Sequence, residues 1–303
     1  MDLAVILLKQ IIMMFILAGV GYCLFKGGKI SKEGSKTIGN ILIYIVLPCV
    51  IVNGFITERT PEKTTALLIS MAAAAILLLI SMVVSRVAFR KDEIAAFAGA
   101  FSNPGFFGIP LIAAVLDSSA SFYIAAFIAL LNILQWTYGV SLLTGEKSGL
   151  EVKKVLKAPF MIAIIIGLIL FFGGIPVPSV VRQSIQYIAN TNTTLAMFVI
   201  GVYLAEVDLP SMFRRKSNYL IAAVRLCAVP LISVLVLSLL PSQFQELKLA
   251  VLIASACPVG SNVAVYAQLH GKDYPYAVET VIISTILSIV TMPLIILLAM
   301  SVW

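Results

Sequence analysis

Residues 100–110 have the sequence Ala100-Phe101-Ser102-Asn103-Pro104-Gly105-Phe106-Phe107-Gly108-Ile109-Pro110, in the middle of an apolar segment over 93–116. A second apolar segment, 247–269, contains Ser255-Ala256-Cys257-Pro258-Val259-Gly260-Ser261-Asn262 at its own middle. A proline inside a helix lacks the N–H of the helical bond and clashes with the carbonyl four residues earlier. A nearby glycine loosens the backbone further. These two stretches therefore predict two helices that are each interrupted at the midpoint.

The composition places both segments in a membrane. Hydrophobic residues make up 61% of the 303 residues and charged residues only 12%, and the mean hydropathy is +1.07. A soluble domain carries roughly 25% charged residues. So few charges cannot cover a surface that faces water, so most of this surface is expected to face lipid.

Apolar segments long enough to cross about 30 Å of hydrocarbon recur along the whole chain. They span about 3–25, 35–55, 64–88, 93–116, 119–143, 158–175, 179–205, 216–240, 247–269 and 275–302. All are expected to be α-helices, because a helix satisfies its backbone polar groups within one segment. No basic residues precede the first segment, so we expect a spanning helix there and not a cleaved signal peptide. The predicted fold is an all-α membrane protein of ten transmembrane helices.

Lysines and arginines are concentrated in alternate loops. One set of loops holds Lys26, Lys29, Lys32, Lys36, Arg86, Arg90, Lys91, Lys147, Lys153, Lys154, Lys157, Arg214, Arg215, Lys216 and Lys272, and the other set holds Arg59, Lys63, Arg182 and Lys248. Because cytoplasmic loops carry the excess of basic residues, both termini are expected outside the cytoplasm of a cell membrane. The net charge of +7 is then a signal of topology, and no nucleic-acid partner is expected.

The chain divides into two halves at its most basic loop. The predicted units are a five-helix repeat over 1–146, a cytoplasmic linker over 147–157 and a second five-helix repeat over 158–303. An odd number of helices in each half makes the second half inverted relative to the first. Interrupted helices at corresponding places of inverted repeats are the best sequence indication of a transporter's binding site.

The two predicted breaks are candidate binding positions. Backbone polar groups exposed at a break cost several kcal/mol in hydrocarbon unless protein or a watery cavity satisfies them. Helix N-termini at the breaks favour an anion. The substrate-binding candidates are Asn103, Pro104, Gly105, Pro258, Gly260, Ser261 and Asn262. The alternative is a pair of simple proline kinks capped by the asparagine side chains.

Several of these motifs resemble the auxin efflux carrier family. The resemblance rests on 102–111, on Cys257-Pro258-Val259-Gly260-Ser261-Asn262, on the last helix from Glu279 to Leu294, and on Leu47-Pro48, Arg225 and Pro230. Pro104 replaces a threonine of the family motif, which moves the first break by about one residue. The resemblance implies ten helices in two inverted repeats with crossing helices 4 and 9, a scaffold and a transport domain, and carriage of organic anions. Compact bacterial members are described as malate or malonate permeases, and family members can form homodimers.

Other polar side chains lie inside the apolar segments. Arg225 could hold an anionic substrate, pair with Glu279 or Glu206, or extend to the cytoplasmic interface. Glu279 is also a candidate for coupling to protons. Candidates for lining a cavity are Asn192, Thr193, Thr194, Asn132 and Ser284, and hydrogen bonding between helices is the alternative for them.

The function predicted from these features is secondary transport of small organic anions, with H⁺ symport, Na⁺ symport and uniport all open. A membrane channel or a ligand sensor is the alternative. No HExxH motif, Ser-His pair or set of metal ligands occurs, so we expect no enzyme activity, no metal and no cofactor.

Overall fold

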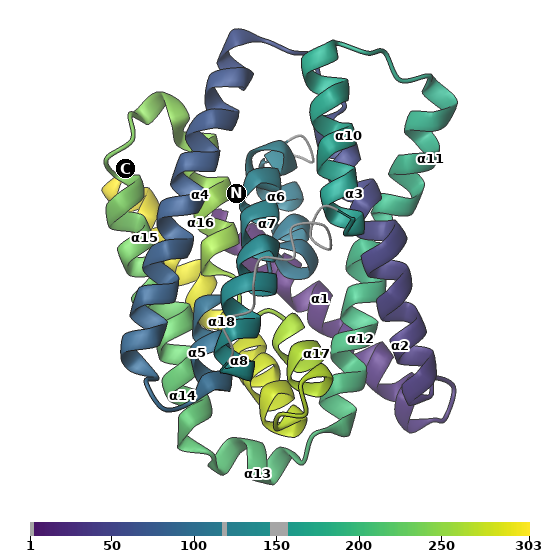
Figure 1. Cartoon of the computed structure of the whole chain (residues 1–303), viewed down its shortest axis with the longest axis vertical. Helices are drawn as coiled ribbons and strands as arrows, with labels where there is room; N and C mark the ends of the chain where they lie inside the picture. The colour runs from purple at the N-terminus through teal and green to yellow at the C-terminus, as the bar shows by residue number, and fades with distance from the viewer. Residues whose placement is uncertain (1–2, 117–119, 146–156) are drawn as a thin grey trace.

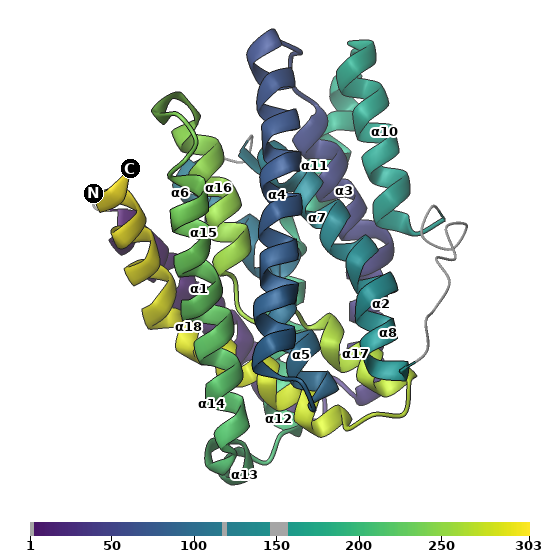
Figure 2. The ribbon, with the colours of Figure 1, turned by 60° about the vertical axis from the view of Figure 1, so that its left-hand side comes forward.

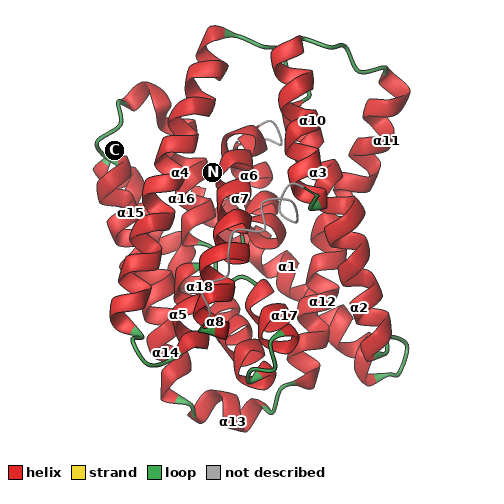
Figure 3. Ribbon diagram, viewed as in Figure 1, coloured by secondary structure: helices red, strands yellow, loops and turns green. Residues whose placement is uncertain are grey.

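The computed structural model describes residues 3–116, 120–145 and 157–303, and within them the chain is helical with short loops (Figure 1, Figure 3). Most of the predicted linker over 147–157, including Lys147, Lys153 and Lys154, lies outside the described residues. One isolated antiparallel bridge, between Ser102 and Val259, is the extended pairing found in the described part.

The helices begin and end within a few residues of the predicted segments. In chain order they are α1 (Leu3–Lys26), α2 (Lys32–Ile41), η1 (Leu42–Val46), α3 (Leu47–Phe55), α4 (Pro61–Ala88), α5 (Glu93–Ala100), η2 (Pro104–Gly108), α6 (Ile109–Leu116), α7 (Ser121–Leu134), η4 (Gln135–Gly139), α8 (Val140–Thr144), α10 (Pro159–Gly173), α11 (Ser179–Asn190), α12 (Asn192–Glu206), α13 (Leu209–Arg214), α14 (Lys216–Ala223), η5 (Val224–Ala228), α15 (Val229–Leu237), η6 (Ser242–Phe244), α16 (Gln245–Ala256), α17 (Asn262–Leu269) and α18 (Tyr274–Val302).

Within the described ranges, seven continuous helical stretches are long and apolar enough to cross a membrane. They are Val5–Lys26, Lys32–Phe55, Pro61–Ala88, Phe122–Thr144, Ser179–Glu206, Lys216–Leu237 and Tyr274–Val302. Two shorter apolar helices, Pro104–Leu116 and Pro159–Gly173, accompany them. The all-helical membrane fold is therefore confirmed.

Two prolines, Pro48 and Pro230, lie in helices that widen locally without ending. Pro48 and Pro230 each lie two residues after a π-helical turn, η1 and η5 respectively. A proline has no N–H for the carbonyl four residues back. The neighbouring N–H bonds instead reach five residues back, from Leu47 to Leu42 and from Val229 to Val224. π-Turns of this kind are frequent at functional sites.

The contacts between helices divide most of the molecule into two groups. The first bundle consists of α1, α2, α3, α10, α11 and α12, in which α1 packs along α12 and α3 packs against α10 and α11. The second bundle consists of α4 to α8 and α14 to α18, with α4 against α5 and α7, α15 against α16, and α14 and α17 against α18. The bundles meet where α1 contacts α18 and α6 and where α3 contacts α7. In Figure 1 much of the first bundle lies to the right and α4, α15 and α16 to the left.

Glycines allow the closest contact within the first bundle. A Cβ atom on Gly201 of α12 would lie 2.0 Å from the Ala18 carbonyl oxygen of α1, and one on Gly21 would lie 2.5 Å from the Phe198 carbonyl oxygen. Small residues at such positions let membrane helices approach backbone to backbone. The close packing of α1 against α12 thus depends on Gly21 and Gly201.

Connections rich in basic residues lie together at one end of the molecule. The link from α1 to α2, the helix α13 and the turn after α17 are all at the lower end in Figure 1, and Figure 2 shows the same arrangement from another side. The links from α3 to α4 and from α10 to α11 lie at the opposite end. The two ends of the structure therefore differ in charge in the sense that the sequence pattern predicts.

Candidate functional site

The two predicted breaks are present, and they contact each other. Helix α5 ends at Ala100 and the next helical turn begins at Pro104, while α16 ends at Ala256 and α17 begins at Asn262. The Asn103 N–H donates to the Pro258 carbonyl at 3.0 Å, and the Gly260 N–H donates to the Phe101 carbonyl at 3.0 Å. We call residues 101–103 and 257–261 the paired breaks. They satisfy part of each other's exposed backbone.

A glycine is required where the two breaks touch. A Cβ atom on Gly260 would lie 2.7 Å from the Ser102 carbonyl oxygen. That oxygen belongs to the backbone of the other break and cannot rotate away. The close approach of the breaks therefore depends on the absence of a side chain at Gly260.

Neighbouring side chains satisfy more of the interrupted backbone. The Ser284 hydroxyl of α18 accepts a hydrogen bond from the Val259 N–H at 3.0 Å. The Asn192 amide of α12 donates to the Gly105 carbonyl at 3.0 Å, which links the first bundle to the helical turn that follows the first break. Asn103 caps its own half-helix, accepting from the Phe106 N–H at 3.3 Å. These contacts explain why polar residues are buried at this depth.

A cavity of about 600 Å³ lies between the two bundles at the paired breaks. The first bundle contributes Lys36, Asn40, Ile43, Tyr44, Leu47, Pro159 and Phe160, with Lys157 and Ala158 just before α10. The second bundle contributes 102–106, Ile128, Leu131, Asn132, Trp136, 260–262, Val265, Tyr266 and Leu269. Residues from both breaks and from both bundles thus surround one space.

Hydrogen-bond donors without a partner are buried at this cavity. Ser102 and Asn103 line it and are 2% and 6% exposed, and the Ser102 hydroxyl and the Asn103 Nδ2 group are buried without a hydrogen-bond partner among the described residues. Behind them, Gln135 accepts a bond from Asn262 Nδ2 at 2.8 Å, while its own Nε2 group has no described partner. Buried polar groups in native proteins are nearly always paired, so these donors are expected to meet a ligand or water.

The charge of the cavity is positive. Lys36 and Lys157 line it and are exposed, whereas no Asp or Glu is among the described residues of the lining. The helical turns beginning at Pro104 and Asn262 start at the cavity, and helix N-termini carry partial positive charge. The site therefore offers hydrogen-bond donors and positive potential, which is the chemistry of an anion site.

Seven of the predicted site residues line this cavity: Asn103, Pro104, Gly105, Gly260, Ser261, Asn262 and Asn132. The lining does not include Pro258, Arg225, Asn192, Thr193, Thr194 or Ser284. Pro258 belongs to the second break, Ser284 bonds Val259 of that break, and Asn192 bonds Gly105 just after the first break. Thr193 and Thr194 follow Asn192 in the first turn of α12 and are half-buried.

Arg225 lies behind the breaks, away from the cavity lining. Its Nη1 group donates to the carbonyls of Gly99 and Ala100, both at 3.2 Å, and its Nη2 group donates to the Ser255 carbonyl. These carbonyls belong to the last turns of α5 and α16. The side chain is 1% exposed, so extension to the cytoplasmic interface is wrong for Arg225.

Pairing of Arg225 with Glu279 or Glu206, an alternative that the sequence left open, is not present among the described contacts. Glu279 accepts from Arg215 Nε at 3.2 Å and from Asn218 Nδ2 at 3.0 Å. Glu206 pairs with Lys32 at 3.2 Å and accepts from the Tyr274 hydroxyl at 3.1 Å. Each acid pairs with a basic residue at the start of another helix, Arg215 just before α14 and Lys32 at the start of α2. The role of Glu279 in proton coupling stays a prediction.

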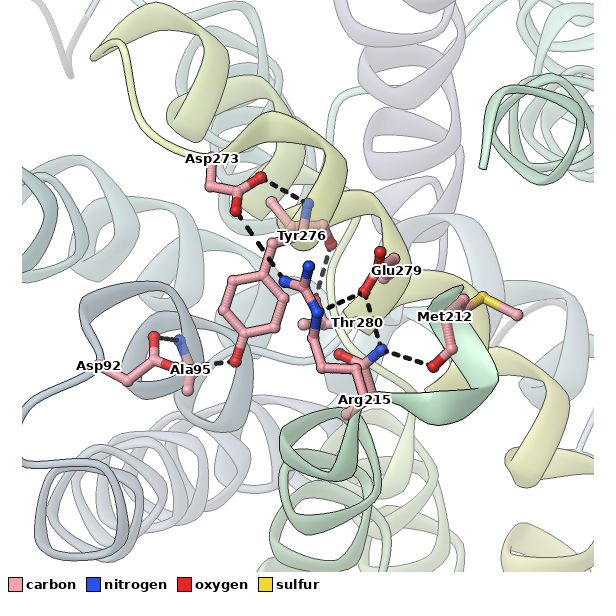
Figure 4. Close-up of polar contacts among 10 residues, drawn as sticks. Asp92, Ala95, Met212, Arg215, Asp273, Tyr276, Glu279 and Thr280 are labelled. Atoms are coloured by element: carbon pink, nitrogen blue, oxygen red, sulfur yellow. Dashed lines mark hydrogen bonds and ion pairs between the residues drawn. The ribbon is translucent and has the colours of Figure 1, made fainter. Parts of the chain in front are cut away.

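Figure 4 shows the network around Glu279. Arg215, just before α14, also approaches Asp273 at 3.9 Å and lies 4.6 Å from the centre of the Tyr276 ring. The Tyr276 hydroxyl donates to Asp92 at 2.8 Å, and Asp92 caps α5 through the Ala95 N–H. The network therefore joins the starts of α5, α14 and α18 within the second bundle.

Sequence reasoning did not select Ser102, Gln135, Lys36 or Lys157 as site residues. Ser102 precedes Asn103 directly, and Gln135 is a polar residue inside an apolar segment, so both carried a signal. In the sequence, the two lysines served only as a signal of topology. Their place at the cavity follows from how α2 and the start of α10 pack. Charge in a loop cannot be assigned to a cavity before the loop is placed.

Comparison with known proteins gives two matches. The family model described as "Membrane transport protein" matches residues 6–296. A protein of Rhizobium meliloti (strain 1021), named "Putative malonate transporter", is similar to this chain, with 26% identity over 278 residues that cover 86% of this chain and 85% of the relative.

Proposed function

Because this chain belongs to the membrane transport protein family of auxin efflux carriers, we propose that it carries small organic anions, such as carboxylates, by alternating access. The family match makes it a multi-pass membrane transporter and not an enzyme. The observation that carries the choice of anions is the set of buried, unpartnered donors at a cavity lined by two lysines and no described acid.

A carboxylate fits these donors chemically. Each carboxylate oxygen accepts several hydrogen bonds, and bonds to a charged acceptor are about twice as strong as neutral ones. Ser102 and Asn103 supply donors from the first break, and Ser261 of the second break and Asn262 just after it line the same cavity. Lys36 and Lys157 supply charge that attracts the anion to the cavity.

The relative supports a narrower substrate class. It is named for malonate, a small dicarboxylate. Two lysines around one cavity match the two negative charges of such a molecule. We therefore place dicarboxylates ahead of monocarboxylates in the order of expected substrates.

The proposed architecture has ten membrane crossings in two inverted repeats. The seven spanning stretches, the helix Pro159–Gly173 and the two interrupted helices, α5 to α6 and α16 to α17, supply the ten. Breaks at matching places in the two halves support the repeat. The basic loops gathered at one end of the molecule support a cytoplasmic position for that end, with both termini on the other side of the membrane. In this proposal the second bundle moves against the first and exposes the cavity to each side in turn.

Uptake by purified protein in proteoliposomes tests the proposal. Labelled malonate, malate and monocarboxylates are supplied outside, with a proton gradient, a sodium gradient or neither. We expect saturable uptake of a carboxylate, strongest for a dicarboxylate, and the gradient that accelerates it identifies the coupling ion. Flux that rises linearly with concentration would indicate a channel, and absence of any carboxylate uptake would contradict the proposed substrate class.

A further inference from the structure

Arg225 is a formal charge buried near the middle of a membrane helix. It lies in η5, within the spanning stretch Lys216–Leu237, and is 1% exposed. Among the described residues it forms no ion pair with an acid, since Glu279 and Glu206 pair elsewhere. A buried charge without compensation costs several kcal/mol or more. Something other than a carboxylate must stabilise it.

Oxygen atoms from three helices surround the guanidinium group. Nη1 donates to the carbonyls of Gly99 and Ala100 and to the Ser81 hydroxyl, the last at 3.0 Å. Nη2 donates to the Ser255 carbonyl. The carbonyls come from the C-terminal turns of the two half-helices α5 and α16, and the hydroxyl comes from α4.

Helix dipoles account for the compensation. The C-terminus of a helix carries the equivalent of roughly −0.5 charge. Two such ends meet at Arg225, so together they offset roughly one positive charge. The paired breaks are therefore polarised, with helix N-termini toward the cavity and helix C-termini toward Arg225.

Hydrogen bonds other than those of Arg225 also hold parts of this oxygen set. The Ser81 hydroxyl donates to the Ala100 carbonyl at 2.7 Å, and the Ser233 and Ser255 hydroxyls bond each other at 2.8 Å. In addition, Ser85 donates to the Ala96 carbonyl at 2.8 Å, one turn earlier in α5. Three carbonyls and a hydroxyl within hydrogen-bond distance of one group form a set of oxygen ligands, the type that coordinates monovalent cations in channels and transporters.

We propose that the Arg225 guanidinium is a built-in cation that permanently fills a monovalent-cation site at the crossing of the half-helices. In transporters with broken helices, half-helix C-termini and unwound carbonyls hold the coupling cation. Here a side chain of the protein occupies such a position. This inference rests on the proposed function for one consequence: transport by the natural protein does not require sodium.

Thermal unfolding of purified protein in detergent tests the site without any transport. Arg225→Ala is compared with the natural protein in choline, sodium, potassium and low-millimolar guanidinium chloride. A ligand that binds the folded state raises its stability in a saturable manner. We expect sodium or guanidinium to raise the unfolding temperature of the Arg225→Ala protein saturably and to leave the natural protein unchanged. Equal responses of both proteins, or no response of the variant, would overturn the cation site.

Two further variants separate charge from hydrogen bonding if Arg225→Ala does not fold. Arg225→Lys keeps the positive charge, and Arg225→Gln keeps an amide donor but no charge. A built-in cation requires that the lysine protein be as stable as the natural one in choline and that the glutamine protein need sodium or guanidinium. If the glutamine protein matches the lysine protein in choline, Arg225 is a hydrogen-bonding residue and the proposal fails.

Proteoliposome uptake completes the test. We expect the natural protein to transport equally well in sodium and in choline, and Arg225→Gln to lose about tenfold in choline, a change of about 1.4 kcal/mol in barrier, and to regain most of it in sodium. Sodium-dependent uptake by the natural protein would contradict the inference. Failure to move any carboxylate would instead count against the proposed function, and the unfolding result would still decide the cation site.

Discussion

Ser102 and Asn103 differ from most buried polar residues of this chain in what their donors contact. Ser70, Ser233 and Thr280 bond carbonyls of their own helices, as hydroxyls in membrane helices commonly do. The Ser102 hydroxyl and the Asn103 Nδ2 group instead have no described partner, and both residues line the cavity. At the scale of single residues, this is the difference that separates a binding role from a packing role.

A negative charge at Asn103 should abolish substrate binding. Asn103→Asp keeps the oxygen that caps the Phe106 N–H but replaces the unpartnered donor with a second acceptor. We expect affinity for the anion to fall by at least about a hundredfold, because a like charge across a binding site costs several kcal/mol. Equilibrium binding of labelled malonate to purified protein measures this. Gln183→Glu, an exposed position of α11, adds the same charge away from the cavity and should leave binding intact.

The two cavity lysines should act through long-range attraction. Lys36 and Lys157 are exposed, so their charges are solvated and screened by salt. Replacing either with glutamine should raise the KM for uptake about threefold to tenfold at low ionic strength and less at high ionic strength. Lys29→Gln, at the same end of the molecule but outside the cavity, is the control. An equal effect of Lys29→Gln would show that the lysines of this end act without regard to the cavity.

Residue identities indicated some of the site and left the rest open. Asn103, Ser261 and Asn262 were predicted because amides and hydroxyls beside a broken helix have few other reasons to be there, and all three line the cavity. Arg225 was predicted near substrate and instead contacts helix ends. A long side chain reaches in many directions from one backbone position, so its target is decided by tertiary packing that the sequence pattern does not contain.

The prolines of the two breaks occupy different places relative to the half-helices. The first break precedes Pro104, which is the first residue of the following helical turn. A proline at that position loses nothing, because its missing N–H would have had no helical partner. The second break includes Pro258, and α17 begins only at Asn262. Proline content therefore predicted the two breaks, and the exact boundaries depended on the contact between them.

Contact between the breaks should be sensitive to a single methyl group. Gly260→Ala places a Cβ against the Ser102 carbonyl, and the φ of Gly260 lies outside the left-handed region, so only the contact is disturbed. Overpacking of this kind costs about 1–3 kcal/mol. We expect a lower unfolding temperature together with loss of uptake. Gly39→Ala is the matched control, since its Cβ would meet nothing within 4 Å. Unchanged unfolding and uptake for Gly260→Ala would mean that the breaks need not touch.

Whole-molecule behaviour depends on how the two bundles are joined. Tyr274, at the start of α18 in the second bundle, donates to Glu206 at the end of α12 in the first bundle. Any motion of one bundle against the other at this end must break that bond. Tyr276, two residues later, bonds Asp92 within the second bundle and would move together with it.

Tyr274→Phe should therefore change rate, and Tyr276→Phe should change stability. A hydrogen bond between a hydroxyl and a carboxylate contributes about 1 kcal/mol here, since both groups are partly exposed. Its loss between bundles should accelerate exchange about twofold to fivefold. The same loss within a bundle should lower the unfolding temperature with little change in exchange. Exchange rates and thermal unfolding of both variants measure this, and identical behaviour of the two would argue against motion between the bundles.

The sequence predicted the helices of the whole molecule better than it predicted how they pack into two bundles. Low charge and long apolar segments predicted helices whose positions the structure confirms to within a few residues, because burial in lipid leaves few alternatives. The assignment of α1, α2 and α10 to α12 to one bundle depends on contacts between distant segments, such as Gly201 against Ala18. Contacts between distant segments leave no periodic pattern in a single sequence, so the sequence did not predict which helices pack together.

Counterflow tests the central claim most directly, namely that an anion bound at the paired breaks is carried across the membrane by the moving protein. Proteoliposomes are loaded with unlabelled malonate, diluted into a trace of labelled malonate, and followed over time. The proposed carrier predicts a transient accumulation of label above equilibrium in the natural protein and in Gln183→Glu, and none in Asn103→Asp. Absence of accumulation in the natural protein, or undiminished accumulation in Asn103→Asp, would contradict it.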